Sequence, residues 1–172
     1  MSQPKLDAKL LKALDDLETK ILALVTSETG LRTVWLQLDS NGNNIVSLAE
    51  IDKFVLEKYP LLNKKPALMR AYKKTIGKPP GIDCDFVYFD QLGELLTNLF
   101  YFNRIYHVFD KIDTDDDKRI DLPEFKSGFS LLKLDKKCKP DAVFSEIDTN
   151  AGGIILFDEF CEWFGKLDVK CL

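Results

Sequence analysis

Acidic and amide side chains recur at fixed intervals in this chain, most clearly in residues 113–124, which read DTDDDKRIDLPE. A twelve-residue loop that holds a hard cation supplies side-chain oxygens from positions 1, 3, 5, 9 and 12 and a backbone carbonyl from position 7. These places are filled by Asp113, Asp115, Asp117, the carbonyl of Arg119, Asp121 and Glu124. The spacing therefore predicts a Ca²⁺ site, at which Mg²⁺ could compete for the same oxygens.

Position 6 of this loop departs from the usual pattern. The chain turns sharply there with a positive φ, which favours glycine, but the residue is Lys118. A side chain in that conformation costs on the order of 1 kcal/mol in local strain. Five ligating carboxylates around a divalent ion can offset this cost, so the prediction of a site stands.

Residues 39–50 fit the same template with fewer charges. The six ligand positions hold Asp39, Asn41, Asn43, the carbonyl of Ile45, Ser47 and Glu50. Asn44 occupies the bend, where asparagine tolerates a left-handed backbone better than most residues. Only Asp39 and Glu50 are anionic, which predicts weaker binding than in residues 113–124. A loop that kept its shape and lost its ion is the alternative.

Residues 148–159 give a third, less complete match. Gly153 lies at the bend, and four ligands are available, namely Asp148, Asn150, the carbonyl of Ile154 and Glu159. Gly152 and Leu156 stand at positions 5 and 9 and offer no side-chain oxygen, so water would have to replace them. Whether this loop binds an ion is left open by the sequence.

A degenerate fourth match covers residues 80–91 when Val87 is placed at position 8. Pro80, Ile82 and Cys84 then stand at positions 1, 3 and 5, with Gln91 at position 12, so the loop cannot chelate Ca²⁺ by this scheme. We expect a mechanical role instead. Val87 would form a short strand pair with Val46, as Ile155 would with Ile120.

Apolar residues at helical spacing flank all four loops and predict eight helices in four helix-loop-helix units. Residues 5–25 carry leucine and isoleucine at the same spacing, which predicts an additional amphipathic N-terminal helix. The expected organisation is all-α, with this helix in 1–26, one pair of units in 27–99 and another in 100–172. The apolar segment 90–112 is expected to be buried, which favours a compact molecule.

Composition excludes several classes of function. The 172 residues are 45% hydrophobic with a net charge of −4, which favours a folded chain and argues against nucleic-acid binding. The four cysteines are irregularly spaced, so neither a zinc site nor a dithiol centre is predicted. No apolar run is long enough to span a membrane. No catalytic motif remains once the carboxylates are assigned to chelation, so we expect no enzyme.

The loops at 39–50 and 113–124, together with their flanking apolar helices, resemble those of the EF-hand calcium-binding superfamily, so the fold is expected to comprise four EF-hand units in two pairs. The stretch FVYFD at 86–90 and the ending from Phe157 to Asp168 resemble the calflagins, flagellar calcium-binding proteins of kinetoplastids. Sarcoplasmic calcium-binding proteins share the length and acidity. The resemblance implies Ca²⁺ binding and a flagellar location. Calflagins resemble lipid-anchored switches, but Ser2 and the lack of cysteine before Cys84 give no acylation signal here.

Three functions are compatible with these features. The first is a cytoplasmic Ca²⁺ sensor that changes conformation toward a protein partner. The second is a Ca²⁺ buffer, and the third is a structural interaction protein with largely ion-free loops. Only two methionines are present, which argues against a promiscuous Met-rich groove. Seven basic residues and no acidic residue lie in 58–78, a run that could contact an anionic membrane or an acidic partner.

Overall fold

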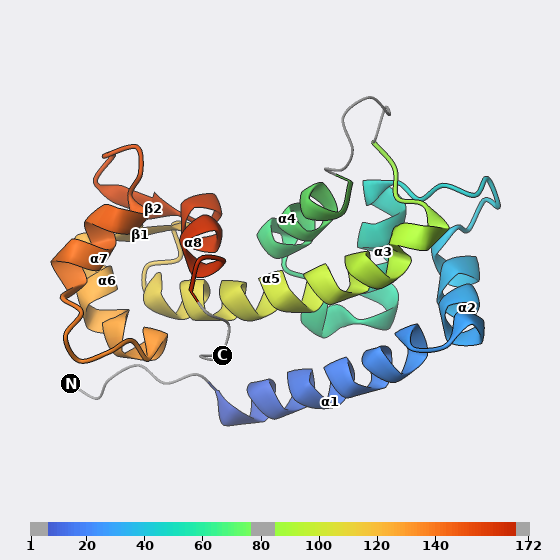
Figure 1. The fold of residues 1–172 in the computed structure, drawn as a ribbon, viewed down its shortest axis with the longest axis horizontal. Coiled ribbons are helices and arrows are strands. Elements are labelled where there is room, and N and C mark those ends of the chain that lie inside the picture. The colour runs from blue at the N-terminus through green and yellow to red at the C-terminus, as the bar shows by residue number, and fades with distance from the viewer. Residues whose placement is uncertain (1–6, 77–84, 168–172) are drawn as a thin grey trace. The chain divides into compact units, whose positions relative to one another are not determined.

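The computed structural model describes residues 7–76 and 85–167. The described chain is mostly helical, with a single two-stranded sheet, which confirms the predicted helical fold (Figure 1). It divides into two compact units, one formed by Lys9–Asn103 and the other beginning at Arg104. Within the described residues, no helix combines the length and the apolar character needed to cross a bilayer.

The first unit contains most of the described helices. Its elements are α1 (Ala8–Val25), α2 (Glu28–Leu38), α3 (Leu48–Lys58), the short η1 (Pro60–Leu62), α4 (Lys65–Ile76) and η2 (Phe89–Gln91). Helix α1 buries Leu14 and Ile21, two of its periodic apolar residues. Ser27 caps the start of helix α2, and its hydroxyl accepts a hydrogen bond from the Gly30 N–H at 3.0 Å. Serine is favoured at this position because it satisfies a backbone donor that the helix cannot.

Val46 and Val87 join the two loop segments of this unit by an isolated antiparallel bridge. The Val46 N–H donates to the Val87 carbonyl at 2.9 Å, and the Val87 N–H donates to the Val46 carbonyl at 2.8 Å. Both side chains are fully buried. The predicted pairing of these valines is therefore confirmed, whereas Pro80, Ile82 and Cys84 of the degenerate loop lie outside the described residues.

Helix α5 (Leu92–Ile112) is one continuous helix of 21 residues. The sequence predicted separate helices after residue 91 and before residue 113, so the expected total of eight helices around the loops is wrong. Gly93 lies in the first turn and the segment contains no proline, so nothing interrupts the backbone hydrogen bonds. Most of its apolar residues are buried, as expected for this segment.

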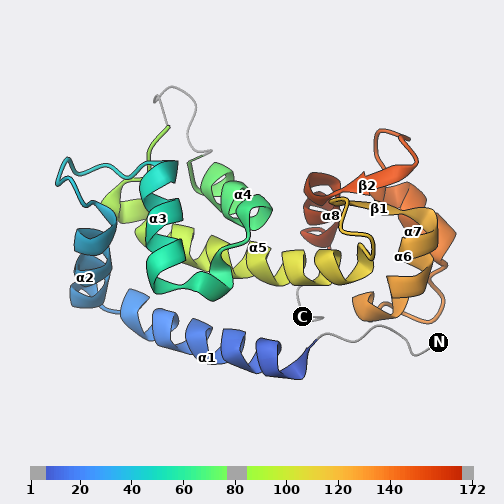
Figure 2. The same cartoon turned by 180° about the vertical axis from the view of Figure 1, so that it is seen from behind.

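The second unit contains the two-stranded sheet and the last helices. Its elements after α5 are β1 (Arg119–Asp121), α6 (Leu122–Gly128), η3 (Phe129–Leu132), α7 (Pro140–Ile147), β2 (Ile154–Leu156) and α8 (Phe157–Phe164), seen from behind in Figure 2. Strands β1 and β2 are antiparallel with Ile120 opposite Ile155. This register confirms the predicted pairing and fixes the loops at 113–124 and 148–159 to each other.

Aromatic rings fill the core of the second unit. Phe109, Phe125 and Phe160 are among its largest fully buried side chains. The Phe109 ring lies edge-on to Phe157 at 5.4 Å and to Phe160 at 5.6 Å between centroids. Edge-on packing of this kind is a favoured aromatic geometry and adds to the energy of burial. This core holds the end of α5, the start of α8 and the loops between them in place.

Candidate metal centre

Three carboxylates of residues 113–124 converge at the end of α5. One oxygen from each of Asp113, Asp115 and Asp117 lies within 4.8 Å of the others. Asp113 is only 5% exposed, and its Oδ1 is buried without a hydrogen-bond partner. Burial raises the pKa of Asp113, against the opposing hydrogen bonds from the backbone N–H groups of Lys118 and Asp116. A buried, unpartnered carboxylate oxygen beside two further carboxylates supplies half of the oxygens that a six-coordinate divalent cation requires.

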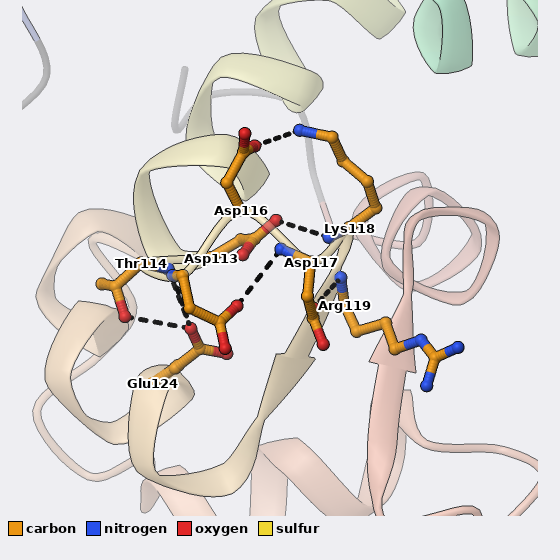
Figure 3. Close-up of polar contacts among 8 residues, drawn as sticks. Asp113, Thr114, Asp116, Asp117, Lys118, Arg119 and Glu124 are labelled. Carbon is orange, nitrogen blue, oxygen red and sulfur yellow. Dashed lines mark hydrogen bonds and ion pairs between the residues drawn. The ribbon is translucent and has the colours of Figure 1, made fainter.

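The backbone of the loop gathers these carboxylates. The Lys118 N–H donates to Asp113 Oδ2 at 3.0 Å, and the Asp117 N–H donates to Asp115 Oδ1 at 3.2 Å. The Arg119 N–H donates in turn to Asp117 Oδ1 at 2.8 Å (Figure 3). These short-range bonds leave one oxygen of each carboxylate for an ion, so the loop orients the acids before any ligand is bound.

Glu124 and Asp121 lie outside this triad and form the start of α6. Glu124 Oε1 accepts from the Thr114 N–H at 2.8 Å and the Thr114 hydroxyl at 2.9 Å, and Oε2 accepts from the Asp121 N–H at 3.0 Å. The Asp121 side chain accepts from the Glu124 N–H at 2.8 Å, which completes a capping box. Burial would raise the pKa of Glu124, but these hydrogen bonds outweigh it and lower the pKa below its ordinary value. Arg119, whose carbonyl was predicted to ligate, is the first residue of β1.

Residues 39–50 fold in the same way. Asp39 is 8% exposed and accepts from the N–H groups of Asn43 at 3.1 Å and Asn44 at 2.9 Å. The Asn43 side chain accepts from the Ile45 N–H at 3.1 Å. The far end of the loop is closed by Glu50, whose Oε1 accepts from the Asn41 amide at 2.9 Å and whose Oε2 accepts from the Ser47 N–H at 2.9 Å. The predicted ligands therefore lie around one loop, with only two carboxylates among them.

Residues 148–159 keep the shape but lack two oxygens. Asp148 accepts from the N–H groups of Gly152 and Gly153, each at 2.9 Å, and the Asn150 amide donates to Glu159 Oε1 at 2.7 Å. A Cβ added at Gly152 would lie 2.5 Å from Asn150 Oδ1, so glycine leaves this amide in its present place. Leu156 is 41% exposed at position 9. Ile154, whose carbonyl was the fourth predicted ligand, begins β2.

The three loops share backbone features that sequence reasoning missed. Position 4 is left-handed as well as position 6, with φ values of 70° at Gly42, 63° at Asp116 and 55° at Ala151. Gly42 was the one residue at position 4 whose type could have indicated the positive φ. In the last two loops, a threonine at position 2 donates its hydroxyl to the glutamate at position 12. Thr114 and Thr149 had no assigned role because neither is a ligand position.

The same hydrogen bond is found between positions 9 and 12 of all four loop segments. The backbone N–H at position 9 donates to the side-chain oxygen at position 12, at 2.9 to 3.1 Å. The pairs are Ser47 with Glu50, Tyr88 with Gln91, Asp121 with Glu124, and Leu156 with Glu159. Residues 85–91 thus keep this part of the pattern although Gln91 carries no charge.

The family model described as an EF-hand domain pair matches residues 102–165. Residues 102–165 have the sequence pattern and the paired loops of an EF-hand domain pair. This segment holds the carboxylate triad, the β1–β2 register and the final loop, so the match covers the strongest predicted site and its partner loop.

The chain is also similar to flagellar calcium-binding proteins, and these matches cover more of the chain than residues 102–165. Protein TB-17 of Trypanosoma brucei brucei is 36% identical over 81 residues, which are 46% of this chain and 35% of that protein. The flagellar calcium-binding protein of Trypanosoma cruzi is 27% identical over 157 residues, or 83% of this chain and 74% of that protein. The match to the Trypanosoma brucei relatives spans between 20% and 37% of their length.

A solved structure of a homologue of programmed cell death 6 protein from Leishmania major Friedlin also matches. It is 20% identical, and the match covers 77% of this chain and 72% of that one, with a TM-score of 0.38. At this level of similarity, no structural or functional feature of that protein is carried over to this chain.

The loop at 39–50 lies outside the EF-hand pair and can be tested by itself. We expect Glu50→Gln to weaken its Ca²⁺ affinity by roughly tenfold or more, because one of its two anionic ligands is lost. Calorimetric titration of the wild type and the variant would measure this. Glu57→Gln removes the same charge from the exposed part of α3 and serves as the control. Equal affinities for Glu50→Gln and the wild type would show that this loop carries no ion.

Proposed function

We propose that this protein is a Ca²⁺ sensor whose principal site is the loop at 113–124. The observation that carries the proposal is the convergence of Asp113, Asp115 and Asp117, with one buried oxygen of Asp113 left without a partner. Arg119 would contribute its carbonyl, and Asp121 and Glu124 would complete the ligands. Bound Ca²⁺ would satisfy the orphaned oxygen and neutralise the gathered carboxylates.

The hydrogen bonds of Glu124 support a sensor, because both oxygens of its carboxylate already accept hydrogen bonds within the loop. To reach the triad it must release the Thr114 N–H and hydroxyl, while its backbone belongs to the first turn of α6. Either the side chain rotates or the start of α6 moves. A change at this ligand is thereby passed to the flanking helix, which is how a sensor differs from a rigid chelator.

The other loops are proposed as weaker sites in the order of their charge. In the loop at 39–50 we assign Asp39, Asn41, Asn43, the Ile45 carbonyl, Ser47 and Glu50 as ligands. In the loop at 148–159 we assign Asp148, Asn150, the Ile154 carbonyl and Glu159, with water in the remaining places. Lower ligand charge predicts lower affinity in the first case and lower still where two oxygens are absent.

We also propose that the chain contains four EF-hand units in two pairs. The Val46 and Val87 bridge supports a pair in the first unit, by analogy with Ile120 and Ile155 in the second. The capping contact between Tyr88 and Gln91 supports the same reading, because it repeats the contact at the end of the other loops. Helix α5 would then serve both pairs.

A buffer is the second candidate, favoured by the tightly packed aromatic core of the second unit. Phe125 and Phe160 are fully buried, and only two methionines are available for a flexible groove. A core of this kind resists opening because large rings would have to leave their packed positions.

Calorimetric titration with Ca²⁺, with and without millimolar Mg²⁺, separates the candidates when a hydrophobic dye is followed in parallel. We expect at least two sites and an increase in dye fluorescence, because the exchange at Glu124 moves α6 and exposes apolar surface. Tight binding without dye fluorescence would indicate a buffer. Absence of Ca²⁺ binding would contradict both and favour a structural interaction protein.

The cellular location and the partners are further proposals. The similarity to the Trypanosoma cruzi protein supports a flagellar location, and imaging of a tagged chain in a flagellated cell would test it.

Contact with an anionic membrane remains a prediction for the basic run, which comprises Lys58, Lys64, Lys65, Arg70, Lys73 and Lys74, with Lys78 outside the described residues. Lys65 pairs with Asp52 on α3. Co-sedimentation with phosphatidylserine vesicles would test this contact.

A further inference from the structure

Two bends of the loop at 113–124, at positions 4 and 6, are made by residues other than glycine. Asp116 and Lys118 have φ values of 63° and 70°, in the left-handed region where a Cβ is strained. The other two loops use glycine or asparagine for at least one of these bends, at Gly42, Asn44 and Gly153. The loop at 113–124 therefore needs other contacts to hold the same backbone.

The side chains of these two strained residues supply such contacts. The Lys118 ammonium pairs with Asp116 Oδ1, and this pairing, together with the nearby hydroxyl of Tyr106 on α5, raises the pKa of Lys118. Figure 3 shows the Lys118 side chain turning back over the loop to reach Asp116, while the Arg119 side chain points away. The Lys118 ammonium thus points toward Asp116 and Tyr106. The Asp116 carboxylate points toward this ammonium and away from the ligand positions.

Tyr106 is a fixed anchor for this contact. It is 4% exposed, and its ring lies edge-on to Phe157 at 5.3 Å and stacks on Phe109 at 6.4 Å. Phe157 is the first residue of α8, directly after β2. A hydroxyl held by this packing can restrain the lysine that contacts it, because the ring cannot rotate or withdraw without disturbing the core.

We propose that Asp116, Lys118 and Tyr106 form a clasp that holds the loop at 113–124 in the conformation that binds Ca²⁺. The proposal rests on the proposed Ca²⁺ site of this loop. Lys118 and Tyr106 are positioning residues: the N–H of Lys118 orients Asp113, and its side chain keeps that N–H in place. A loop ordered before binding gives up less conformational entropy when the ion is bound, so the clasp raises affinity.

Tyr106→Phe, Lys118→Met and the double variant test the clasp as a thermodynamic cycle. Phenylalanine keeps the ring and removes only the hydroxyl, and methionine keeps the length of the side chain without its charge. We expect Tyr106→Phe to weaken Ca²⁺ binding at this loop by about threefold to tenfold and the double variant to bind no more weakly than the worse single one. Lys118→Arg, which retains a charged donor, should restore most of the coupling.

Lys111→Met is the matched control for charge, because it removes an exposed cation from the last turn of α5, two residues before Asp113. We expect it to leave the Ca²⁺ affinity of the loop nearly unchanged, or slightly higher because one positive charge near the loop is lost. Coupling of the two clasp substitutions should also appear in urea unfolding without Ca²⁺. Additive effects in both measurements, or equal effects of Lys111→Met and Lys118→Met, would overturn the clasp. If the wild type binds no Ca²⁺ at this loop, the clasp and the proposed site both fail, whereas additive effects in a wild type that binds reject the clasp alone.

Discussion

Glu124→Gln is expected to abolish Ca²⁺ binding at the loop at 113–124 under conditions in which the wild type is saturated. The amide removes one negative charge and one of the two oxygens of a bidentate ligand. A loss of about 3 kcal/mol of binding free energy, or roughly a hundredfold in affinity, follows from losing a charged ligand of this kind. Calorimetric titration should show one tight site fewer than in the wild type.

Glu159→Gln is the matched control, because Glu159 makes the same contacts to the threonine at position 2 and the N–H at position 9. Both variants should lose similar folding stability, on the order of 1 kcal/mol, since each weakens the cap of the following helix. Only Glu124→Gln should remove a tight site. Unchanged stoichiometry in Glu124→Gln would show that this loop is not the principal site.

Phe109→Ala should have the largest effect on folding stability. Phe109 is 1% exposed and contacts the rings of Tyr106, Phe157 and Phe160. Truncating a buried phenylalanine removes its transfer free energy and leaves a cavity, which together cost about 3 to 5 kcal/mol. Urea unfolding followed by the fluorescence of Trp163, which is buried in the same unit, would measure the loss.

Leu36→Ala provides the comparison for an apolar residue outside the core. Leu36 is 76% exposed, so its truncation should change the free energy of unfolding by less than about 0.5 kcal/mol. If Phe109→Ala cost no more than Leu36→Ala, the aromatic core described for the second unit would be wrong. Phe109→Ala should also weaken Ca²⁺ binding at residues 113–124, because Tyr106 loses a packing neighbour.

Much of the fold was predictable because the twelve-residue pattern carries its own register. Aligning three of the loops by their ligand positions places Val46, Ile120 and Ile155 at position 8, and the degenerate loop was aligned by placing Val87 there. Both strand pairings follow from that alignment, and both are observed. The apolar spacing likewise predicted where helices precede and follow each loop, since one face of each must be buried.

The sequence was less informative where a residue has two compatible uses. Gly93 and the aromatic residues after it suit either a linker between two helices or a single helix, and only tertiary packing selects α5. Lys118 was predicted to strain the loop, which its φ of 70° agrees with, but its contact with Tyr106 joins residues twelve positions apart. Spacing within the loop carries no signal for a contact of that range.

The contact between positions 9 and 12 has a consequence for how such proteins diverge. The helix after each loop starts at a hydrogen bond to a side-chain oxygen at position 12, and this bond is present with Gln91 at that position as it is with Glu50 and Glu124. The architecture needs an oxygen there, whereas chelation needs a charge. A single substitution of glutamate by glutamine can therefore silence a unit as an ion site without dismantling it. The number of ions that such a chain carries is free to drift while its framework stays intact.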